Sequence, residues 1–261
     1  MPSLPLIEPN TALFLDFDGT LADLAPRPDL VQVEPELVGT LRALHTQLGG
    51  AVALISGRPI AELDHFLHPL RLPAAGVHGA ELRDAGGYRL REQDRAVPLL
   101  LPPLSALVNA HPGLQLEPKA VAVAVHYRAV PHLEGLVRNF AAELASGVPG
   151  IEVLHGKMVV ELKPAGVDKG GAIAAFMRGP PFARRLPLFA GDDITDEAGF
   201  AVVRRLGGVG VLVGERPSAA TVSVPGPAAL RCWLHRSAKA LEAMAAAEGA
   251  PEPGTTSTTT S

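Results

Sequence analysis

Two acidic residues, Asp16 and Asp18, stand one residue apart near the start of the chain and precede Gly19 and Thr20. They follow an apolar run over residues 12–15. Side chains two positions apart in an extended segment point the same way, and two carboxylates this close repel each other unless a cation lies beside them. Helix capping would explain one aspartate but not the pair. We therefore interpret the motif as a site for Mg²⁺, which prefers carboxylate and carbonyl oxygens together with a phosphate.

A second acidic pair, Asp192 and Asp193, follows another predicted strand over residues 186–190. A carboxylate at this position can complete the metal site begun by Asp16. Capping is an equally good interpretation, because Asp193 or Thr195 can cap the helix that follows. Both interpretations can hold at once.

Two single residues fit the same chemistry. Ser56 follows an apolar run over residues 51–55, and a hydroxyl at a strand end beside a helix N-terminus makes a phosphate cradle. Lys169 opens a later helix and can offset negative charge during attack on phosphorus. Taken alone, Ser56 is a helix cap and Lys169 a solvated lysine, and Lys163 competes for the lysine role. The order acid pair, hydroxyl, lysine, acid pair favours the functional interpretation.

The elements that must position these residues alternate between strands and helices. The alternation predicts an α/β fold built on a parallel sheet with right-handed crossovers. In such a sheet ligands bind beyond the carboxyl ends of the strands, where the acid pairs and Ser56 stand. We predict strands over residues 12–17, 51–55, 73–77, 186–189 and 209–213, and helices over 35–48, 60–67, 169–177 and 228–247.

The middle of the chain has a different pattern, in which strands neighbour strands. It predicts an antiparallel sheet with helices on one face, inserted as a cap domain over residues 100–163. The predicted elements are helices over 98–110 and 133–145, strands over 114–117 and 121–127, and a hairpin over 151–154 and 158–162. Residues 1–99 and 164–248 then form the catalytic core. We expect the tail, residues 249–261, to be disordered, because it consists mainly of Pro, Gly, Ser and Thr.

Composition excludes several classes of function. The formal net charge is −4 with both signs interspersed, which argues against a nucleic-acid partner. No apolar stretch approaches the roughly 18 residues that span a bilayer, so we expect no membrane partner. The lone Cys232 permits no disulfide within the chain, and the N-terminus has no secretory pattern, so we expect a cytoplasmic protein. The sequence does not fix the oligomeric state, and we favour a monomer.

The order of motifs resembles that of the haloacid dehalogenase-like phosphatases up to about residue 245. In detail it is similar to the trehalose-phosphate phosphatase family, including motifs inside the predicted cap, where related phosphatases differ most. The resemblance rests on residues 15–21, 56–58, 76–81, 125–128, 156–157, 160–164, 169–170 and 191–197. It implies a Rossmann-like parallel sheet core with an inserted α+β cap, and a phosphatase that forms an aspartyl-phosphate on the way from trehalose 6-phosphate to trehalose.

The resemblance also implies roles for individual residues. Asp16 is expected to be the nucleophile, and Asp18 the general acid and base. Mg²⁺ is expected to bind Asp16, the backbone carbonyl of Asp18, and Asp192, with Asp193 nearby. Ser56 and Lys169 are expected to hold the phosphate. Further substrate contacts are expected at Gly19, Thr20, Gly57, Arg58 and His78 in the core, and at Glu117, Lys119, Arg128, Lys157 and Glu161 in the cap.

The cap residues also have plain structural interpretations. Lys157 and Glu161 are expected to share a face of one strand, where they either bind sugar or form an ion pair. Arg128 can simply end a strand, and His78 and His126 can be structural hydrogen-bonding residues.

Three alternative functions stay open at this point. The same core would serve a phosphatase for sucrose phosphate or mannosylglycerate phosphate. A sugar phosphomutase also keeps both acids of the first motif. An inactive binding module is disfavoured, because Asp16 and Asp18 are both present.

Overall fold

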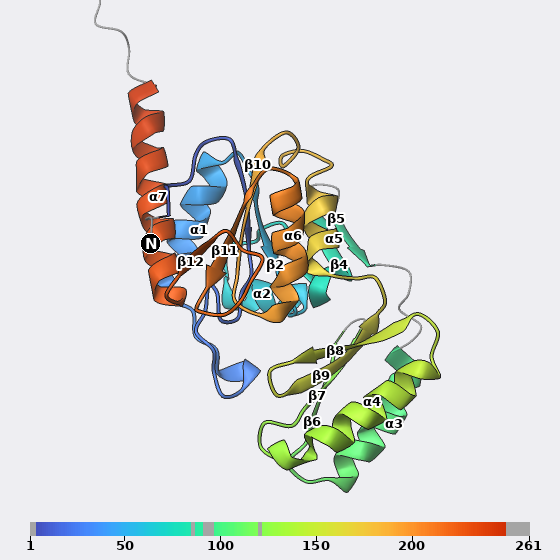
Figure 1. Ribbon diagram of the computed structural model, residues 1–261. Helices are drawn as coiled ribbons and strands as arrows, with labels where there is room; N and C mark the ends of the chain where they lie inside the picture. The colour runs from blue at the N-terminus through green and yellow to red at the C-terminus, as the bar shows by residue number, and fades with distance from the viewer. Residues whose placement is uncertain (1–3, 85–86, 91–96, 120–121, 249–261) are drawn as a thin grey trace, which may run out of the picture.

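The larger of two sheets forms the centre of the protein. A computed structural model describes residues 4–84, 87–90, 97–119 and 122–248, and Figure 1 shows its elements. The sheet has eight strands in the order β12-β11-β10-β1-β2-β3-β4-β5, and those from β12 to β3 run parallel. The strands are β1 (Thr11–Leu15), β2 (Val52–Ile55), β3 (Ala74–Gly76), β4 (Glu81–Asp84), β5 (Gly87–Leu90), β10 (Leu186–Gly191), β11 (Val209–Val213) and β12 (Val222–Val224). The predicted parallel α/β core is confirmed.

The sheet is wider than the sequence predicted. At one edge, β4 and β5 form an antiparallel hairpin that extends β3. At the other edge, β12 adds three residues beside β11. Both additions lack the continuous apolar run of a buried strand, since β4 carries Arg83 and Asp84, which are only partly buried. Edge strands are covered less completely, so the hydrophobic pattern does not reveal them.

Helices cover both faces of the larger sheet, as Figure 1 shows. On one face α1 packs against α7, and on the other α5 packs against α6. A stripe of leucines in α1, namely Leu37, Leu41 and Leu44, faces the core. At the start of α5, the side chain of Asp168 accepts a hydrogen bond from Gly171 N at 2.6 Å and fixes the point where the helix begins. The helices are α1 (Pro35–Gln47), α2 (Ile60–Phe66), α5 (Lys169–Phe176), α6 (Glu197–Arg205) and α7 (Pro227–Glu248).

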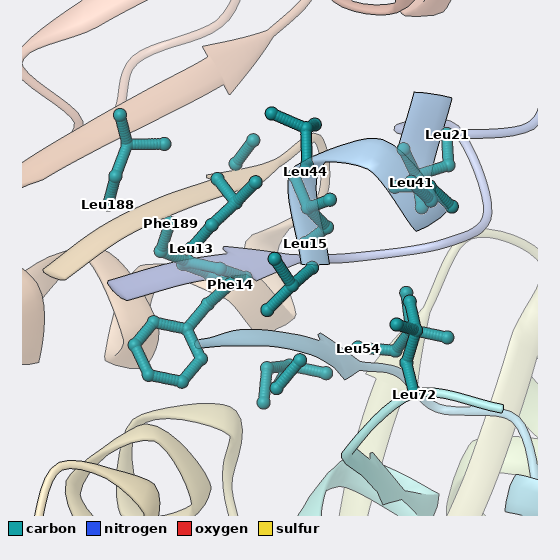
Figure 2. Packing of buried hydrophobic residues seen from close by; sticks show 14 of the residues in the cluster. Leu13, Phe14, Leu15, Leu21, Leu41, Leu44, Leu54, Leu72, Leu188 and Phe189 are labelled. Carbon is teal, nitrogen blue, oxygen red and sulfur yellow. The ribbon is translucent and has the colours of Figure 1, made fainter. Parts of the chain in front are cut away.

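Strand β1 lies in the middle of the apolar core. Figure 2 shows Leu13, Phe14 and Leu15 packed among side chains from neighbouring strands and α1. All five residues of β1 are buried, which explains why the four that follow Thr11 are all apolar. The ring of Phe14 stacks on that of Phe182 with centroids 5.3 Å apart. The residue that follows β1, Asp16, is therefore attached to one of the most firmly packed segments of the chain.

The second sheet is antiparallel and has four strands in the order β6-β7-β9-β8. In Figure 1 it lies between the core and helices α3 and α4, which pack on its far side. Its elements are α3 (Val97–Ala110), β6 (Gln115–Pro118), β7 (Val123–His126), α4 (Glu134–Ser146), β8 (Ile151–Gly156) and β9 (Val159–Pro164). The predicted α+β insert has this content. The division of the chain at residues 100 and 163 stays a prediction, and the predicted tail falls outside the described residues.

The hairpin of β8 and β9 corrects one expectation. Lys157 lies in the turn between the strands and not on the strand that carries Glu161. The next residue, Met158, has φ = +63°, a left-handed conformation that a regular strand does not contain. The predicted strand over residues 158–162 therefore begins at Val159, and the expected shared face of Lys157 and Glu161 does not exist.

Within the described residues, every helix is too short or too polar to cross a lipid bilayer.

Candidate active site

Three carboxylates converge beyond the ends of two neighbouring strands. Asp16, Asp192 and Asp196 each present an oxygen within 4.8 Å of the others. Asp16 follows β1 and Asp192 follows β10, and these two strands pair in parallel with Leu15 opposite Ala190. Gly19 lies against this group with φ = +74°, and a Cβ there would fall 2.2 Å from Asp192 Oδ2. Only glycine lets the backbone approach so closely.

A single buried ammonium group, that of Lys169, links two of these carboxylates. Its Nζ atom lies 2.8 Å from Asp16 Oδ1 and 2.7 Å from Asp196 Oδ1. Burial alone would lower the pKa of Lys169, but the two carboxylates outweigh that effect and raise it, so the amine stays charged. Lys163, the competing candidate, is buried elsewhere and pairs with Glu152.

The carboxylate group carries more negative charge than Lys169 can offset. Burial is the main reason that the pKa of Asp16 is raised well above its usual value, and repulsion from Asp196 and Asp192 adds to it. Burial, followed by repulsion from Asp196, raises the pKa of Asp192 to about 6. A divalent cation would relieve both effects. Asp16 and Asp192 would be its ligands, because both oxygens of Asp196 already accept hydrogen bonds, Oδ1 from Lys169 and Oδ2 from the backbone N–H of Asp193.

Asp18 points into a fork made by Arg58. Arg58 Nε lies 2.6 Å from Asp18 Oδ2, and Nη2 lies 2.7 Å from Oδ1. The third nitrogen, Nη1, donates to Glu62 Oε2 at 2.9 Å. The guanidinium carbon lies 4.8 Å from the ring centroid of Phe66 and 5.7 Å from that of Phe17. Arg58 was predicted to contact substrate, yet each of these three nitrogens donates to a carboxylate.

Two hydroxyl residues, Thr20 and Ser56, follow the neighbouring strands β1 and β2. Thr20 Oγ1 lies 3.2 Å from Asp192 Oδ1 and 3.4 Å from Asp16 Oδ2, so its proton can serve either carboxylate. Ser56 is buried at the end of β2, and its Oγ accepts a hydrogen bond from the backbone N–H of Arg58 at 3.1 Å. The Ser56 hydroxyl proton therefore remains available for a phosphate oxygen.

The sheet of the predicted cap presents a buried ion pair toward the core. Lys119 Nζ lies 2.5 Å from Glu161 Oε2 and also donates to the backbone oxygen of Gly57 at 3.2 Å. The other oxygen of Glu161, Oε1, is buried and has no hydrogen-bond partner among the described residues. An orphaned buried carboxylate oxygen is costly, so this atom marks a place where a ligand donor would be favourable.

His78 is the core residue that faces this orphaned oxygen. Its Nε2 lies 3.6 Å from Glu161 Oε1, which is too long for a hydrogen bond. Its ring packs so tightly on Gly57 that a Cβ there would lie 2.8 Å from Nε2. The His78 imidazole is neutral at pH 7, since its pKa is lowered well below the usual value by burial first and then by Lys169, Lys119 and Lys163.

Two further polar contacts line the same side. Glu117 Oε2 lies 2.6 Å from His126 Nε2. Burial would raise the pKa of Glu117, but the hydrogen bond from His126 and the charge of Lys119 lower it overall. Arg128 Nη1 donates to the backbone oxygen of Ala25 at 3.3 Å and so reaches from the second sheet to the core.

One cavity of about 490 Å³ joins the acidic centre to the second sheet. Its volume is in the range of small-molecule sites. Of the residues predicted to act at the site, it is lined by Asp16, Asp18, Ser56, Gly57, Arg58, His78, Glu117, Lys119, Arg128, Lys157, Glu161, Lys169, Asp192 and Asp193. Two predicted residues, Gly19 and Thr20, fall outside this lining. The backbone of Gly19 lies close to the Asp192 carboxylate, and the Thr20 hydroxyl donates to it.

Comparison with known proteins decides the family. The sequence profile described as "Trehalose-phosphatase" matches residues 14–228. The chain is 42% identical to "Trehalose-6-phosphate phosphatase" of Escherichia coli (strain K12) over 240 residues, which cover 91% of this chain and 90% of that protein. The chain belongs to the trehalose-phosphatase family. It is also 44% identical over 226 residues to "Probable trehalose-phosphate phosphatase" of Sinorhizobium fredii, covering 85% of each chain.

Solved structures agree with the fold expected of a trehalose-phosphatase family member. The C-terminal domain of the C. albicans trehalose-6-phosphate phosphatase superposes with a TM-score of 0.78 at 23% identity, covering 88% of this chain and 93% of that one. A haloacid dehalogenase-like hydrolase from Bacteroides thetaiotaomicron superposes with a TM-score of 0.62 at 18% identity, covering 89% and 98%. At these identities the likeness concerns the fold alone.

This family member holds two site residues that the sequence reasoning missed. Asp196, and not Asp193, is the third carboxylate of the converging group. Asp193 lines the cavity, but its Oδ1 accepts from the backbone N–H of Ile194 at 2.7 Å and caps a short helix. Asp193 and Asp196 cap the short helix reciprocally. A sequence pattern that explains capping gives no reason to expect that Asp196 also pairs with Lys169. Arg216 donates to the backbone oxygens of Asp192 and Asp193 at 2.8 and 2.5 Å. It belongs to none of the sequence motifs, so it could not be predicted as a site residue.

Proposed function

We propose that this family member hydrolyses trehalose 6-phosphate to trehalose and inorganic phosphate. The names of its relatives from E. coli and S. fredii support this substrate. The observation that carries the proposal is that one cavity has buried carboxylates and Lys169 at one end and the Lys119–Glu161 pair at the other. One end suits a phosphate and the other suits a hydroxyl-rich sugar.

The reaction begins with attack by Asp16. Its carboxylate oxygen forms a bond to phosphorus, the bond from phosphorus to the sugar oxygen breaks, and an aspartyl-phosphate results. Lys169 holds one oxygen of Asp16 at 2.8 Å, which orients the other toward the substrate. Ser56 and Lys169 bind the phosphate oxygens and stabilise the charge that gathers in the transition state.

Asp18 carries the protons of both half-reactions. As an acid it protonates the departing sugar oxygen, and as a base it takes a proton from the water that attacks the aspartyl-phosphate. The hydrolysed ester returns Asp16 to its carboxylate form and releases phosphate. The same two-step use of a carboxylate nucleophile explains why both acids of the first motif are needed.

We further propose that the acidic centre binds Mg²⁺. Asp16, Asp192 and the backbone carbonyl of Asp18 would hold it, with Asp193 nearby. The raised pKa values of Asp16 and Asp192 support this ligand set, because burial and, after it, repulsion from the neighbouring carboxylates both disfavour the charged forms that a cation would stabilise. When bound, the ion would supply positive charge that lets an anionic nucleophile approach an anionic phosphate.

The second sheet would select the sugar. Glu161 Oε1 would accept a hydrogen bond from a sugar hydroxyl, which satisfies its orphaned oxygen. Lys119 and His78 would donate to neighbouring oxygens of the sugar. Remaining contacts are proposed at Gly57, Glu117, Arg128 and Lys157, all of which line the cavity. We also propose that residues 100–163 form a cap domain over the site, and that the protein is a monomer in the cytoplasm.

A panel of sugar phosphates with and without Mg²⁺ tests the function. We expect phosphate release to be fastest from trehalose 6-phosphate and to stop when the metal is removed by a chelator. Sucrose 6-phosphate, mannosylglycerate phosphate and glucose 6-phosphate serve as comparisons. Faster turnover of any of these three would replace the proposed substrate. Transfer of phosphate to a second sugar without release of free phosphate would indicate a mutase.

A further inference from the structure

We infer that Arg58 is a positioning residue, which holds the carboxylate of Asp18 in place and so determines how well the enzyme expels a poor leaving group. The inference rests on the proposed function, in which Asp18 protonates the departing sugar oxygen. It reassigns Arg58, which the sequence suggested as a substrate contact.

The pairing of Arg58 with Asp18 constrains the acid more than a single hydrogen bond would. Both carboxylate oxygens are bound, at 2.6 and 2.7 Å, by two nitrogens of one planar group. The Asp18 side chain is 34% exposed, whereas that of Arg58 is only 8% exposed. The buried partner is therefore the fixed one, and it holds a carboxylate that would otherwise rotate freely at the cavity surface.

Arg58 is itself held on several sides. The ring of Phe66 lies under its guanidinium, with the ring of Phe17 close by. Glu62, one helical turn along the chain, accepts from Nη1 at 2.9 Å. The backbone N–H of Arg58 donates to Ser56 Oγ. A lysine at this position could not reproduce the flat fork or its stacking on the rings.

The geometry favours positioning over direct phosphate binding. Asp18 occupies the edge of Arg58 formed by Nε and Nη2, and Nη1 donates to Glu62, so a phosphate would have to displace Asp18 to bind that edge. The two roles differ in their kinetic consequences. A direct phosphate contact affects every phosphate ester alike, whereas a residue that acts through Asp18 affects only those esters whose leaving group needs a proton.

Two substrates separate these roles. The alcohol oxygen of trehalose is a poor leaving group and needs a proton as its bond to phosphorus breaks. Asp18 supplies it from its protonated form, in which one oxygen carries the proton and the other still accepts from Arg58. The phenolate of p-nitrophenyl phosphate leaves as a stable anion and needs little help. The value of kcat/KM reports the steps up to transfer of phosphate to Asp16, so the later role of Asp18 as a base does not enter the comparison.

The test measures kcat/KM on both substrates for wild type, Arg58→Lys, Asp18→Asn and the double variant. We expect Arg58→Lys to lower kcat/KM about 10²-fold on trehalose 6-phosphate, in the range of general acid catalysis, and less than about threefold on p-nitrophenyl phosphate. We expect the double variant to match Asp18→Asn, because Arg58 acts through Asp18. Equal losses on both substrates, or losses that multiply in the double variant, would overturn the inference.

A matched control exists in the same molecule. Arg83 forms a similar fork with Asp64, with distances of 2.6 and 2.7 Å, outside the lining of the cavity. Arg83→Lys should leave the ratio of the two kcat/KM values unchanged. If Arg58→Lys does not fold, Glu62→Gln replaces it and should shift the ratio in the same direction by a smaller factor. An unchanged ratio in Glu62→Gln would then count against the inference.

The same data distinguish this inference from the proposed function. If wild type fails to release phosphate from trehalose 6-phosphate, the proposed function is wrong. If wild type is active but Arg58→Lys lowers both kcat/KM values equally, only the role of Arg58 is wrong.

Discussion

The two ends of the cavity differ in how their charges are balanced. At the end of the larger sheet, Asp16, Asp192 and Asp196 surround the single ammonium of Lys169. Negative charge is therefore in excess, and burial together with repulsion from Asp196 raises the pKa of Asp192. This end of the cavity is therefore suited to bind a cation that is not part of the chain.

At the end of the second sheet both carboxylates already have a side-chain partner. Lys119 binds Glu161, and His126 binds Glu117. One acceptor at this end lacks a hydrogen-bond donor, since Glu161 Oε1 is buried without a partner among the described residues. The comparison shows that one cavity can be built for two different needs, a counter-ion at one end and a neutral hydroxyl at the other.

The acidic end is disrupted most completely by Asp16→Asn. An amide is a far weaker nucleophile than a carboxylate, so we expect kcat to fall by about 10⁴-fold or more, as for other removed nucleophiles. Phosphate release from trehalose 6-phosphate measures this loss. Circular dichroism should show an unchanged fold, because asparagine has nearly the same shape. Retained turnover in this variant would be incompatible with an aspartyl-phosphate.

The balance at the same end depends next on Lys169. Lys169→Met leaves Asp16 and Asp196 buried without their cation, and removing one partner of a buried ion pair costs about 3–5 kcal/mol. Urea unfolding of the metal-free protein at pH 7.5 measures the change. Lys239→Met, which breaks a pair with Glu242 in an exposed position, is the control and should change stability very little. Similar effects of the two variants would mean that the buried network contributes nothing special.

The residues that the sequence placed at this end of the cavity do lie together, for a physical reason. Asp16, Ser56 and Asp192 each follow a buried apolar strand, and parallel strands bring such residues to one edge. Local pattern and position in the fold therefore agree. The central strands were found for the same reason, whereas the edge strand β12 was not, because only part of it is buried.

Pairings between distant segments could not be predicted. Lys119 follows β6 and Glu161 lies in β9, and both strands pair with β7. The register of these pairings brings the two side chains together, and it cannot be derived from the sequence of either strand alone. Lys157 was placed wrongly because one left-handed residue, Met158, moved the turn. Arg216 contacts the backbone of Asp192 only through its long side chain, and such a contact produces no recognisable pattern in the sequence.

The sugar end is tested by Glu161→Gln. The amide cannot pair with Lys119 as a carboxylate does and offers a weaker acceptor to a hydroxyl, so kcat/KM on trehalose 6-phosphate should fall about 10²-fold. On p-nitrophenyl phosphate it should change little, because that substrate has no sugar. Glu152→Gln is the matched control, since Glu152 pairs with the buried Lys163 outside the lining of the cavity. Equal losses of Glu161→Gln on both substrates would show that Glu161 supports the fold and not the choice of sugar.

The smallest expected effect is a gain in stability, whereas the other variants lose activity or stability. The pKa of Asp192 is raised from 3.8 to about 6 in the metal-free fold, mainly by burial. Between these two values the folded state binds more protons than the unfolded state, so Asp192 makes the protein less stable as pH rises through this window. Asp192→Asn removes the penalty. We expect it to stabilise the metal-free protein by about 1–2 kcal/mol at pH 7.5 and by little at pH 4, the full shift of about two units setting an upper limit near 3 kcal/mol.

Thermal melting at the two pH values, with and without Mg²⁺, measures this effect. Magnesium should raise the Tm of wild type at pH 7.5, raise it less at pH 4, where protons compete for the carboxylates, and scarcely change that of Asp192→Asn. Asp64→Asn is the control of opposite sign, because hydrogen bonds from Arg83 outweigh the effect of burial and lower the pKa of Asp64. That variant should lose stability at pH 7.5. A metal-free Asp192→Asn that is no more stable than wild type would mean that Lys169 alone already balances the acidic end, and the contrast between the two ends of the cavity would disappear.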